Sequence, residues 1–250
     1  MKSVPEHYLG VWQRTLLTTT DGVHDTATAV YWLQTASLFA DLRIPQPGPR
    51  DAAGRALQAG FAGVTAIDGD ICQWHRAIDF QPPSGRDDIG RMRFERADYL
   101  LEDGLDGSYH EVWERLPESL GRNWGVWLVA NGGRQGCLLL AGDYFLFAAG
   151  RGAILPPAES LSALLAEGDA KALLAFELSF GRHRGGATPW AIELSTLAGR
   201  AGQALLPATV DPDGLDRALT TAVLAELGAL PPAGGWQRRE SPLFAEEVTP

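Results

Sequence analysis

Apolar and polar residues alternate along short runs over most of the chain, and turn-forming dipeptides separate these runs. Asp21-Gly22, Asp68-Gly69, Asn131-Gly132 and Gly142-Asp143 supply the positive φ angles that tight hairpins need. A series of short antiparallel strands is typical of a barrel or a sandwich, so we expect an all-β protein. The runs that predict strands are LGVWQRTLL, AVYWLQT, SLFADLRI, GVTAI, ICQWHRAIDF, GRMRFER, YHEVWERL, WGVWLVA, CLLLA, YFLFAA, AFELSFGR and WAIELST.

Two segments have the period of a helix instead. Residues 159–167 follow two prolines and place three leucines on one face. Residues 211–227 begin with Asp211 as a cap and Pro212 at the first helical position, and an apolar stripe follows until Gly228. An amphipathic helix of this kind normally lies on a sheet or covers the end of a barrel.

The character of the strands changes near residue 120. Strands before LPESLGRN (Leu116 to Asn123) are rich in Arg, Asp and Glu, whereas the strands after it are mostly apolar. We therefore expect two domains, residues 1–120 and 121–250. The Pro-rich stretch at Ile44 to Arg50 predicts a loop at the rim of the first domain.

The frame Y-x-x-V-W-x-R occurs twice, at Tyr8 to Arg14 and at Tyr109 to Arg115. On a strand, Tyr, Trp and Arg of this frame share one face and Val lies on the other. Both copies fall in the first domain, so they are interpreted as the first and last strands of one barrel. Trp12 and Trp113 are then expected to be neighbours across the closing seam.

The strands of the first half carry charged residues and large aromatics on the same face. One interpretation is that this face is simply in contact with water. The other is that it points into a barrel, because large aromatics are costly to leave in water. The second interpretation gives a cavity with aromatic walls and charged groups, in which every buried charge needs a partner. Its candidate ligand-binding residues are Trp12, Arg14, Phe39, Asp41, Arg43, His75, Arg93, Glu111, Trp113 and Arg115.

The net charge of −10 and the pI of about 4.9 limit the kinds of partner that the protein can bind. The chain has no basic run and its only lysines are Lys2 and Lys171, which argues against nucleic acid and against an anionic membrane surface. Cys72 and Cys137 have neither zinc nor disulfide spacing and are expected to be buried free thiols. The first residues lack the apolar run of a secretory signal, so we expect a soluble cytoplasmic protein. Long edge strands leave a dimer open.

Sequence motifs of known catalytic chemistry are missing. The chain contains no G-x-S-x-G, phosphate-binding loop, dinucleotide fingerprint or H-E-x-x-H, and no histidines at metal-ligand spacing. No cofactor and no metal ion are predicted. If the barrel is an enzyme, its candidate bases are His75, Asp79, Glu95 and Glu111.

Gly10-Val11-Trp12, at the start of the first strand, resembles the G-x-W signature of the calycins, the lipocalin-like barrels. The resemblance implies that Trp12 closes one end of a barrel against an arginine, either Arg115 or Arg14. Gly125-Val126-Trp127 repeats the signature and implies a second barrel. YWLQTASLFADLRIP, SYHEVWERL, GCLLLAGDYFLFAAGR and AFELSFGR also resemble, in order, strands of a fungal family of casein-kinase-interacting proteins built of two calycin-like barrels, whose molecular function is not established.

Three functions follow from this fold. The first is a binding module that holds a small amphipathic or anionic organic ligand in the N-terminal barrel, with Trp12 and Trp113 as floor and wall. In that module Arg14, Arg43, Arg93 and Arg115 would supply charge-assisted contacts. The second is an isomerase, lyase or cyclase on the same barrel. The third is an interaction module with fully packed barrels and an exposed apolar patch.

Overall fold

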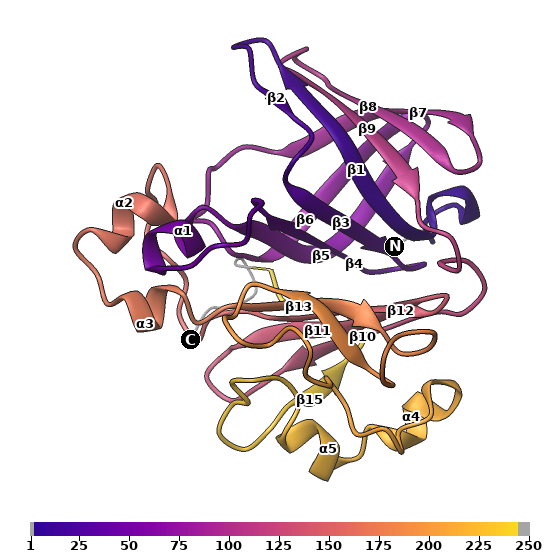
Figure 1. Ribbon diagram of the computed structural model, residues 1–250, viewed down its shortest axis with the longest axis vertical. Helices are drawn as coiled ribbons and strands as arrows, with labels where there is room; N and C mark the ends of the chain where they lie inside the picture. The colour runs from indigo at the N-terminus through magenta and orange to yellow at the C-terminus, as the bar shows by residue number, and fades with distance from the viewer. Residues whose placement is uncertain (1–2, 245–250) are drawn as a thin grey trace.

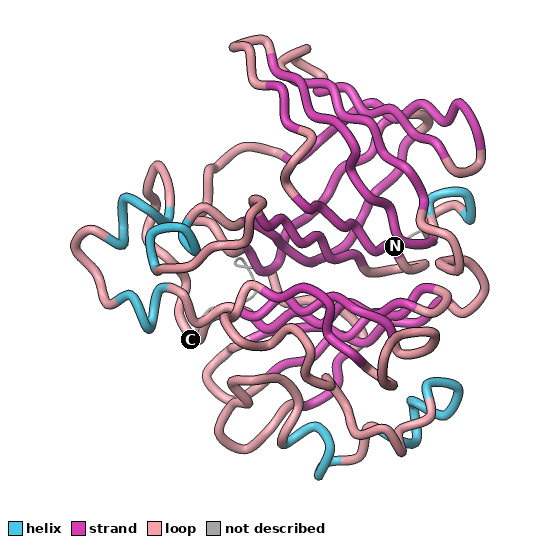
Figure 2. The backbone as a smooth tube through the Cα atoms, in the orientation of Figure 1, coloured by secondary structure: helices cyan, strands magenta, loops and turns pink. Residues whose placement is uncertain are grey.

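A computed structural model describes residues 3–244, and two antiparallel sheets dominate it (Figures 1 and 2). The first sheet has the strand order β2-β1-β3-β4-β5-β6-β7-β8-β9, and β1 also pairs with β9. That last pairing closes eight of the strands into a barrel, to which the short β2 is added. The strands are β1 (Gly10–Thr19), β2 (His24–Asp25), β3 (Ala29–Gln34), β4 (Phe39–Ile44), β5 (Ala59–Asp68), β6 (Ile71–Asp79), β7 (Asp88–Arg96), β8 (Tyr99–Gly104) and β9 (Tyr109–Arg115).

The two copies of Y-x-x-V-W-x-R lie on the strands that close the barrel, except that Tyr8 of the first copy precedes β1 and belongs to a 3-10 turn. Trp12 of β1 is opposite Arg115 of β9, and Arg14 is opposite Trp113. The repeat therefore marks the first and last strands of one barrel, as the sequence predicts.

The second sheet has six strands in the order β14-β13-β12-β11-β10-β15. Over residues 3–244 no pairing joins β14 to β15, so this sheet is open and a second closed barrel is not confirmed. The division of the chain into domains at residue 120 stays a prediction. The strands are β10 (Asn123–Val129), β11 (Gln135–Ala141), β12 (Tyr144–Ala149), β13 (Glu177–Arg182), β14 (Ala191–Ser195) and β15 (Gln237–Arg239).

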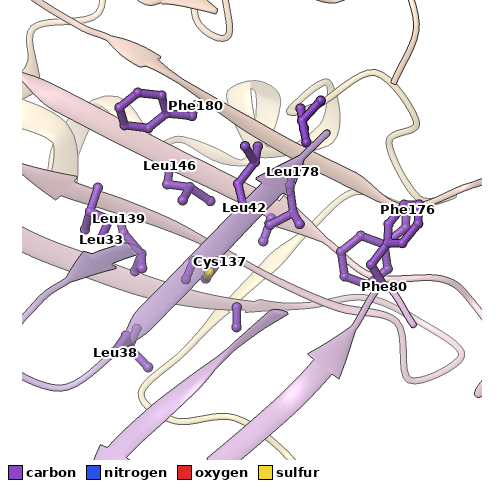
Figure 3. Close-up of a cluster of buried hydrophobic side chains, with 14 of the residues drawn as sticks. Leu33, Leu38, Leu42, Phe80, Cys137, Leu139, Leu146, Phe176, Leu178 and Phe180 are labelled. Carbon is purple, nitrogen blue, oxygen red and sulfur yellow. The ribbon is translucent and has the colours of Figure 1, made fainter. Parts of the chain in front are cut away.

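The largest core lies between the barrel and the second sheet. Outward-facing side chains of β3 and β4, such as Leu33 and Leu42, meet Leu139, Leu146 and Leu178 of the second sheet (Figure 3). All five are fully buried. Glycine permits the close approach, because a Cβ on Gly60 would collide with Leu178 and a Cβ on Gly125 would crowd Leu38.

Aromatic and polar contacts fix how the second sheet sits on the barrel. The ring of Tyr31 on β3 stacks on Phe180 at 4.4 Å, and Phe180 stacks on Tyr144 at 5.6 Å. The Asn123 side chain accepts a hydrogen bond from the backbone N–H of Ala36 at 2.9 Å and donates to the Gln34 carbonyl at 3.1 Å. The sheet thus covers the apolar outer wall of β3 to β5.

The far side of the second sheet is covered by the C-terminal third of the chain. Leu138, Phe145 and Phe147 on that side pack against Leu215 and Leu224 from two short helices. Figure 1 shows the resulting three layers: the barrel, the second sheet, and the segment that carries α4 and α5.

The helices are short. Ser160 caps α2, which falls inside the predicted helix 159–167. The single helix predicted over residues 211–227 is wrong, because a 3-10 turn and two short helices replace it. The chain leaves helical geometry at Leu219, where ψ is 65°, and Thr220 then caps a new helix. The helical segments are η1 (Glu6–Tyr8), α1 (Ala52–Ala56), α2 (Leu161–Leu165), α3 (Ala170–Leu173), η2 (Pro212–Gly214), α4 (Leu215–Ala218) and α5 (Thr221–Ala225).

The cysteines are free and buried in the described structure, Cys72 inside the barrel and Cys137 in the core between the sheets. Within residues 3–244, none of the helices has the length and hydropathy that a membrane crossing requires.

Leu178→Ala tests the dependence of the barrel on the second sheet. Removing a fully buried side chain from the shared core is expected to lower the free energy of unfolding by about 2–5 kcal/mol. Urea unfolding followed by circular dichroism measures it, with Leu120→Ala, 61% exposed, as the control. Barrel and sheet are expected to unfold in one transition; a variant that loses the second sheet while the barrel stays folded would contradict the shared core.

Candidate functional site

One end of the barrel is sealed by Trp12 and Arg115. Trp12 is fully buried and its indole N–H donates to the Tyr8 carbonyl at 2.8 Å. The Arg115 guanidinium lies 4.5 Å from the centre of the Trp12 ring and donates to the carbonyls of Leu9 at 3.1 Å, His7 at 2.8 Å and Ala97. The G-x-W resemblance implied this arrangement with either Arg115 or Arg14 as the partner. In the structure the partner is Arg115.

Gly10 is needed for this seal. Its φ is +126°, and a Cβ there would lie 3.2 Å from Cδ of Arg115 and 3.0 Å from Oγ of Ser119. A larger residue would push the arginine away from the Trp12 ring. The glycine of the signature therefore makes room for the arginine.

Tryptophans fill the barrel above the seal. Trp32 of β3 stands between Trp12, at 6.4 Å, and Trp113, at 5.9 Å, and it contacts Trp74 edge to face at 5.6 Å. The expected neighbours across the seam, Trp12 and Trp113, thus lie on paired strands, and both rings contact Trp32. Closely fitting indoles make this end of the barrel a packed core.

The opposite end of the barrel is charged. Arg14, with 5% of its side chain exposed, donates to Glu111 at 2.7 Å and to Asp25 at 2.8 Å. Arg43 donates to Asp41 at 2.7 Å. Burial alone would lower the pKa of Arg43, but the negative charges of Asp41 and Glu111 outweigh burial and raise it.

A third arginine closes the rim of this end. Arg76 donates to Asp79 at 2.8 Å and to Asp88 at 2.7 Å. Its guanidinium lies 3.5 Å from the centre of the Phe61 ring, on which Arg43 also lies at 5.1 Å. We call this charged end, formed by Arg14, Arg43, Arg76 and the carboxyl groups around them, the open end of the barrel.

Glu102 of β8 is a buried acid that lines the hollow of the open end without an arginine partner among the ion pairs described above. It is 4% exposed, and it accepts hydrogen bonds from the Tyr109 hydroxyl at 2.8 Å and the Trp113 indole at 3.1 Å. Glu111 is directly opposite it on β9. Burial and then the charge of Glu111 raise the pKa of Glu102 well above its usual value, although the Tyr109 hydrogen bond works against the shift.

Two hollows adjoin at the open end. The first, inside the barrel, has a volume of about 10 Å³, which is room for about one water molecule. The second is a groove of about 570 Å³ outside the barrel wall, between β6, the 81–88 loop and the 150–155 loop, and it shares Trp74 and Asp88 with the first. The inner cavity is lined by Trp32, Phe39, Asp41, Arg43, Phe61, Trp74, Asp88, Glu102 and Trp113.

Seven of the predicted site residues point into the barrel. Of these seven, Trp12 belongs to the packed end, and the other six lie around the cavity or in the ion pairs of the open end. Arg115 is not among the seven, because it forms the seal with Trp12. Only Phe39, Asp41, Arg43 and Trp113 of the predicted set line the cavity itself. The seven inward residues are Trp12, Arg14, Phe39, Asp41, Arg43, Glu111 and Trp113.

His75 and Arg93 are placed wrongly by the alternation argument. Arg93 lies on the outer wall with 61% of its side chain exposed, beside Glu95, because Met92 and Phe94 are the inward residues of β7. On β6, Cys72, Trp74 and Arg76 point inward, and His75 faces the outer groove. Ala77 is an extra residue opposite β5, and this bulge brings Asp79 back inside without His75.

Several residues that line the cavity were not among the site residues predicted from the sequence. Trp32 alternates with Val30 and Gln34 in AVYWLQT, so its inward direction was readable from the sequence. Glu102 sits in LLEDG, where alternation is weak. Its signal is the hairpin register around Asp106-Gly107, which places it opposite Glu111. Two carboxyl groups directly opposite each other on paired strands repel when both are charged, so such a pair is destabilising and marks a position with an unusual environment.

Among residues 3–244, no three His, Cys, Asp or Glu side chains are arranged to hold a metal ion. The ionisable groups at the open end are instead arranged as arginine–carboxylate pairs. Their chemistry is that of charge and hydrogen bonding.

Comparison with solved structures agrees with the barrel. The uncharacterized protein YLR301w of Saccharomyces cerevisiae superposes with a TM-score of 0.54 at 11% identity, over 74% of this chain and 84% of that one. A lipocalin-like protein of Bacteroides uniformis (TM-score 0.33, 12% identity) and an uncharacterized protein of Bacteroides eggerthii (0.32, 10%) each cover 44% of this chain and 99% of their own. No family model and no curated protein matches the chain.

The closed antiparallel barrel, sealed by a G-x-W tryptophan and an arginine, gives the chain a calycin-like fold. The resemblance to the calycins is thereby confirmed for the fold. The likeness to the yeast protein covers 74% of this chain, which is more than the barrel alone.

Gly10→Ala tests the seal. The strained φ and the crowding of Arg115 are expected to lower the free energy of unfolding by about 1–3 kcal/mol, measured by urea unfolding. Gly48→Ala is the control, because a Cβ at Gly48 meets nothing within 4 Å. Equal effects of the two substitutions would show that the arginine does not need the space at Gly10.

Glu102→Gln tests the raised pKa. The pKa of Glu102 is higher in the folded protein than its ordinary value of 4.5 in the unfolded chain, so the folded protein binds the Glu102 proton more tightly. The proton therefore contributes its full stabilisation of the fold below pH 4.5, and this contribution is lost as the pH rises through the folded pKa. Glutamine has no proton to lose. Urea unfolding at about pH 4, 6 and 8 should show that the free energy of unfolding of the variant increases relative to that of the native protein as the pH rises.

The exposed Glu114 on β9 provides a matched control for this measurement. Glu114→Gln is expected to change the free energy of unfolding by less than about 0.5 kcal/mol. If the difference between Glu102→Gln and the native protein were the same at every pH, the pKa of Glu102 would not be raised.

Proposed function

We propose that this protein binds a small amphipathic organic molecule at the open end of its barrel. The observation that carries the proposal is the inner cavity, in which five aromatic side chains and four charged ones converge, and which adjoins a groove of about 570 Å³. A groove of this volume is in the range of small-molecule sites. The sealed end gives the site a rigid floor, so that a ligand has to approach from the charged end.

The arginines do not serve the ligand in the way expected from the sequence. Arg14 and Arg43 are held by carboxylates, Arg115 is at the sealed end, and Arg93 is on the outer wall. An anionic ligand would have to break an existing ion pair before it gained a new one. These contacts favour the amphipathic ligand of the original expectation over the anionic one.

One observation favours the enzyme as a second candidate. Glu102 lines the cavity and burial raises its pKa, and a buried acid with a raised pKa is a candidate for proton transfer. Of the bases proposed from sequence, Asp79 and Glu111 are at the open end, whereas His75 and Glu95 face outward. An enzyme would chemically change the compound that it binds, which mass spectrometry of the bound compound would reveal.

Intrinsic fluorescence tests the binding function. A screen of medium-chain amines, carboxylates and alcohols is expected to contain compounds that shift the tryptophan emission, because Trp32, Trp74 and Trp113 line the cavity. Trp74→Phe should reduce the change by more than half, as it removes the ring shared by both hollows.

Trp124→Phe is the matched control and should retain the fluorescence change, because Trp124 belongs to β10 in the second sheet. If none of the three classes of compound changed the emission, the barrel would not be a binding site. The packed interaction module would then be the better account.

A further inference from the structure

We infer that the ligand of the open end is a primary alkylamine whose ammonium group occupies the inner cavity. This inference rests on the proposed binding function and adds the chemical class of the ligand. It follows from the size of the cavity, the balance of charge around it and the chemistry of its walls.

The size of the cavity selects the head group. A volume of about 10 Å³ accepts a group of about the size of one water molecule. A primary ammonium group is of that size, whereas a trimethylammonium group or a phosphate is several times larger. The cavity therefore fits the end of a chain and not a bulky head group.

The balance of charge selects the sign. Across the described residues of the open end, six carboxyl groups stand against three guanidinium groups, and each guanidinium is already bound to a carboxylate. If Glu102, whose pKa is raised by burial, is counted as neutral, five carboxyl groups remain against three guanidinium groups, and this surplus leaves the cavity with a negative potential. The carboxyl groups are those of Asp25, Asp41, Asp79, Asp88, Glu102 and Glu111, and the guanidinium groups are those of Arg14, Arg43 and Arg76.

The walls of the cavity offer contacts for a cation. The carboxyl groups of Asp41, Asp88 and Glu102 line it and can accept hydrogen bonds from an ammonium group. Arg43 and Arg76 already lie on the Phe61 ring, so the rings of this barrel accept cations in the structure itself. A carboxylate head group would meet those three acids instead, and Arg43, which also lines the cavity, is already paired with Asp41.

The outer groove accounts for the alkyl tail. It shares Trp74 and Asp88 with the inner cavity, so a chain leaving the cavity past these residues enters the groove. Ile154, Leu155 and Phe244 supply apolar surface there, and Ile154 is 78% exposed. Affinity should accordingly rise with chain length, by about two- to fourfold for each buried methylene group.

Calorimetric titration of hexylamine, hexanoate, hexanol and hexyltrimethylammonium tests the inference. Hexylamine is expected to bind at least tenfold more tightly than the other three. Asp88→Asn removes one lining charge and leaves Arg76 paired with Asp79, so it should weaken hexylamine binding about five- to tenfold. Asp68→Asn, the same charge change on an exposed residue that lines neither hollow, should change it less than twofold.

The outcomes separate the ligand class from the binding function. Tighter binding of hexanoate or hexanol, or equal effects of Asp88→Asn and Asp68→Asn, would overturn the amine while the binding function stood. Equal binding of hexylamine and hexyltrimethylammonium would overturn the placement of the head group in the inner cavity. Binding of none of the four would leave a cavity that holds only water, and would overturn the inference; the wider fluorescence screen decides the binding function. Near-ultraviolet circular dichroism confirms that each variant is folded.

Discussion

The guanidinium of Arg115 lies 4.5 Å over the ring of Trp12, and the closure of the barrel brings these two side chains together. Arg115 also donates to three backbone carbonyls from the η1 region and the β7–β8 turn, so one side chain ties the first strand, the last strand and the turn beside them. Gly10 leaves the space that this contact needs. Once the first and last strands are paired, the alternation of side chains decides what is inside the barrel.

Closure divides the interior into two unlike halves. Near the seal, Trp32 packs against both Trp12 and Trp113. Toward the open end the same strands present acids and arginines, whose burial is tolerated because the arginines are bound to carboxylates. Glu102 lies at the boundary, with Trp113 on one side and Glu111 on the other. The surplus of acid at this boundary is what distinguishes the site from the packed half below it.

The outer wall explains why the chain continues after the barrel. Leu33 and Leu42 point away from the interior and would be exposed if β10 to β13 did not cover them (Figure 3). The second sheet, covered in turn on its far face by the C-terminal segment, has no interior to close around. The described part of the chain therefore forms one barrel and one sandwich-like layer, which is consistent with a shared core.

Sequence pattern was sufficient for the barrel because its information is local. The repeated frame placed Trp12 and Trp113 on the paired first and last strands, and simple alternation placed Phe39, Asp41 and Arg43 at the cavity. Arg115, predicted to bind the ligand and offered with Arg14 as the partner of Trp12, lies in the seal. Alternation failed where the backbone departs from a regular strand, as at the bulge of Ala77, and where both faces of a strand are mixed, as at Arg93. A helical stripe over residues 211–227 did not prevent a break at Thr220, whose side chain caps a new helix. The importance of Glu102 depends on the pairing of β8 with β9, which a single strand does not reveal.

Nuclear magnetic resonance of the tryptophan indole N–H groups measures the central claim residue by residue. The eight signals can be assigned with single Trp→Phe variants and followed while hexylamine is added. The account predicts that the signals of Trp32, Trp74 and Trp113, which line the cavity, move. The signals of Trp124 and Trp190, which pack in the core on the far side of the second sheet, should stay in place. Movement confined to the second sheet, or no movement of any indole signal, would contradict a ligand site at the open end of the barrel.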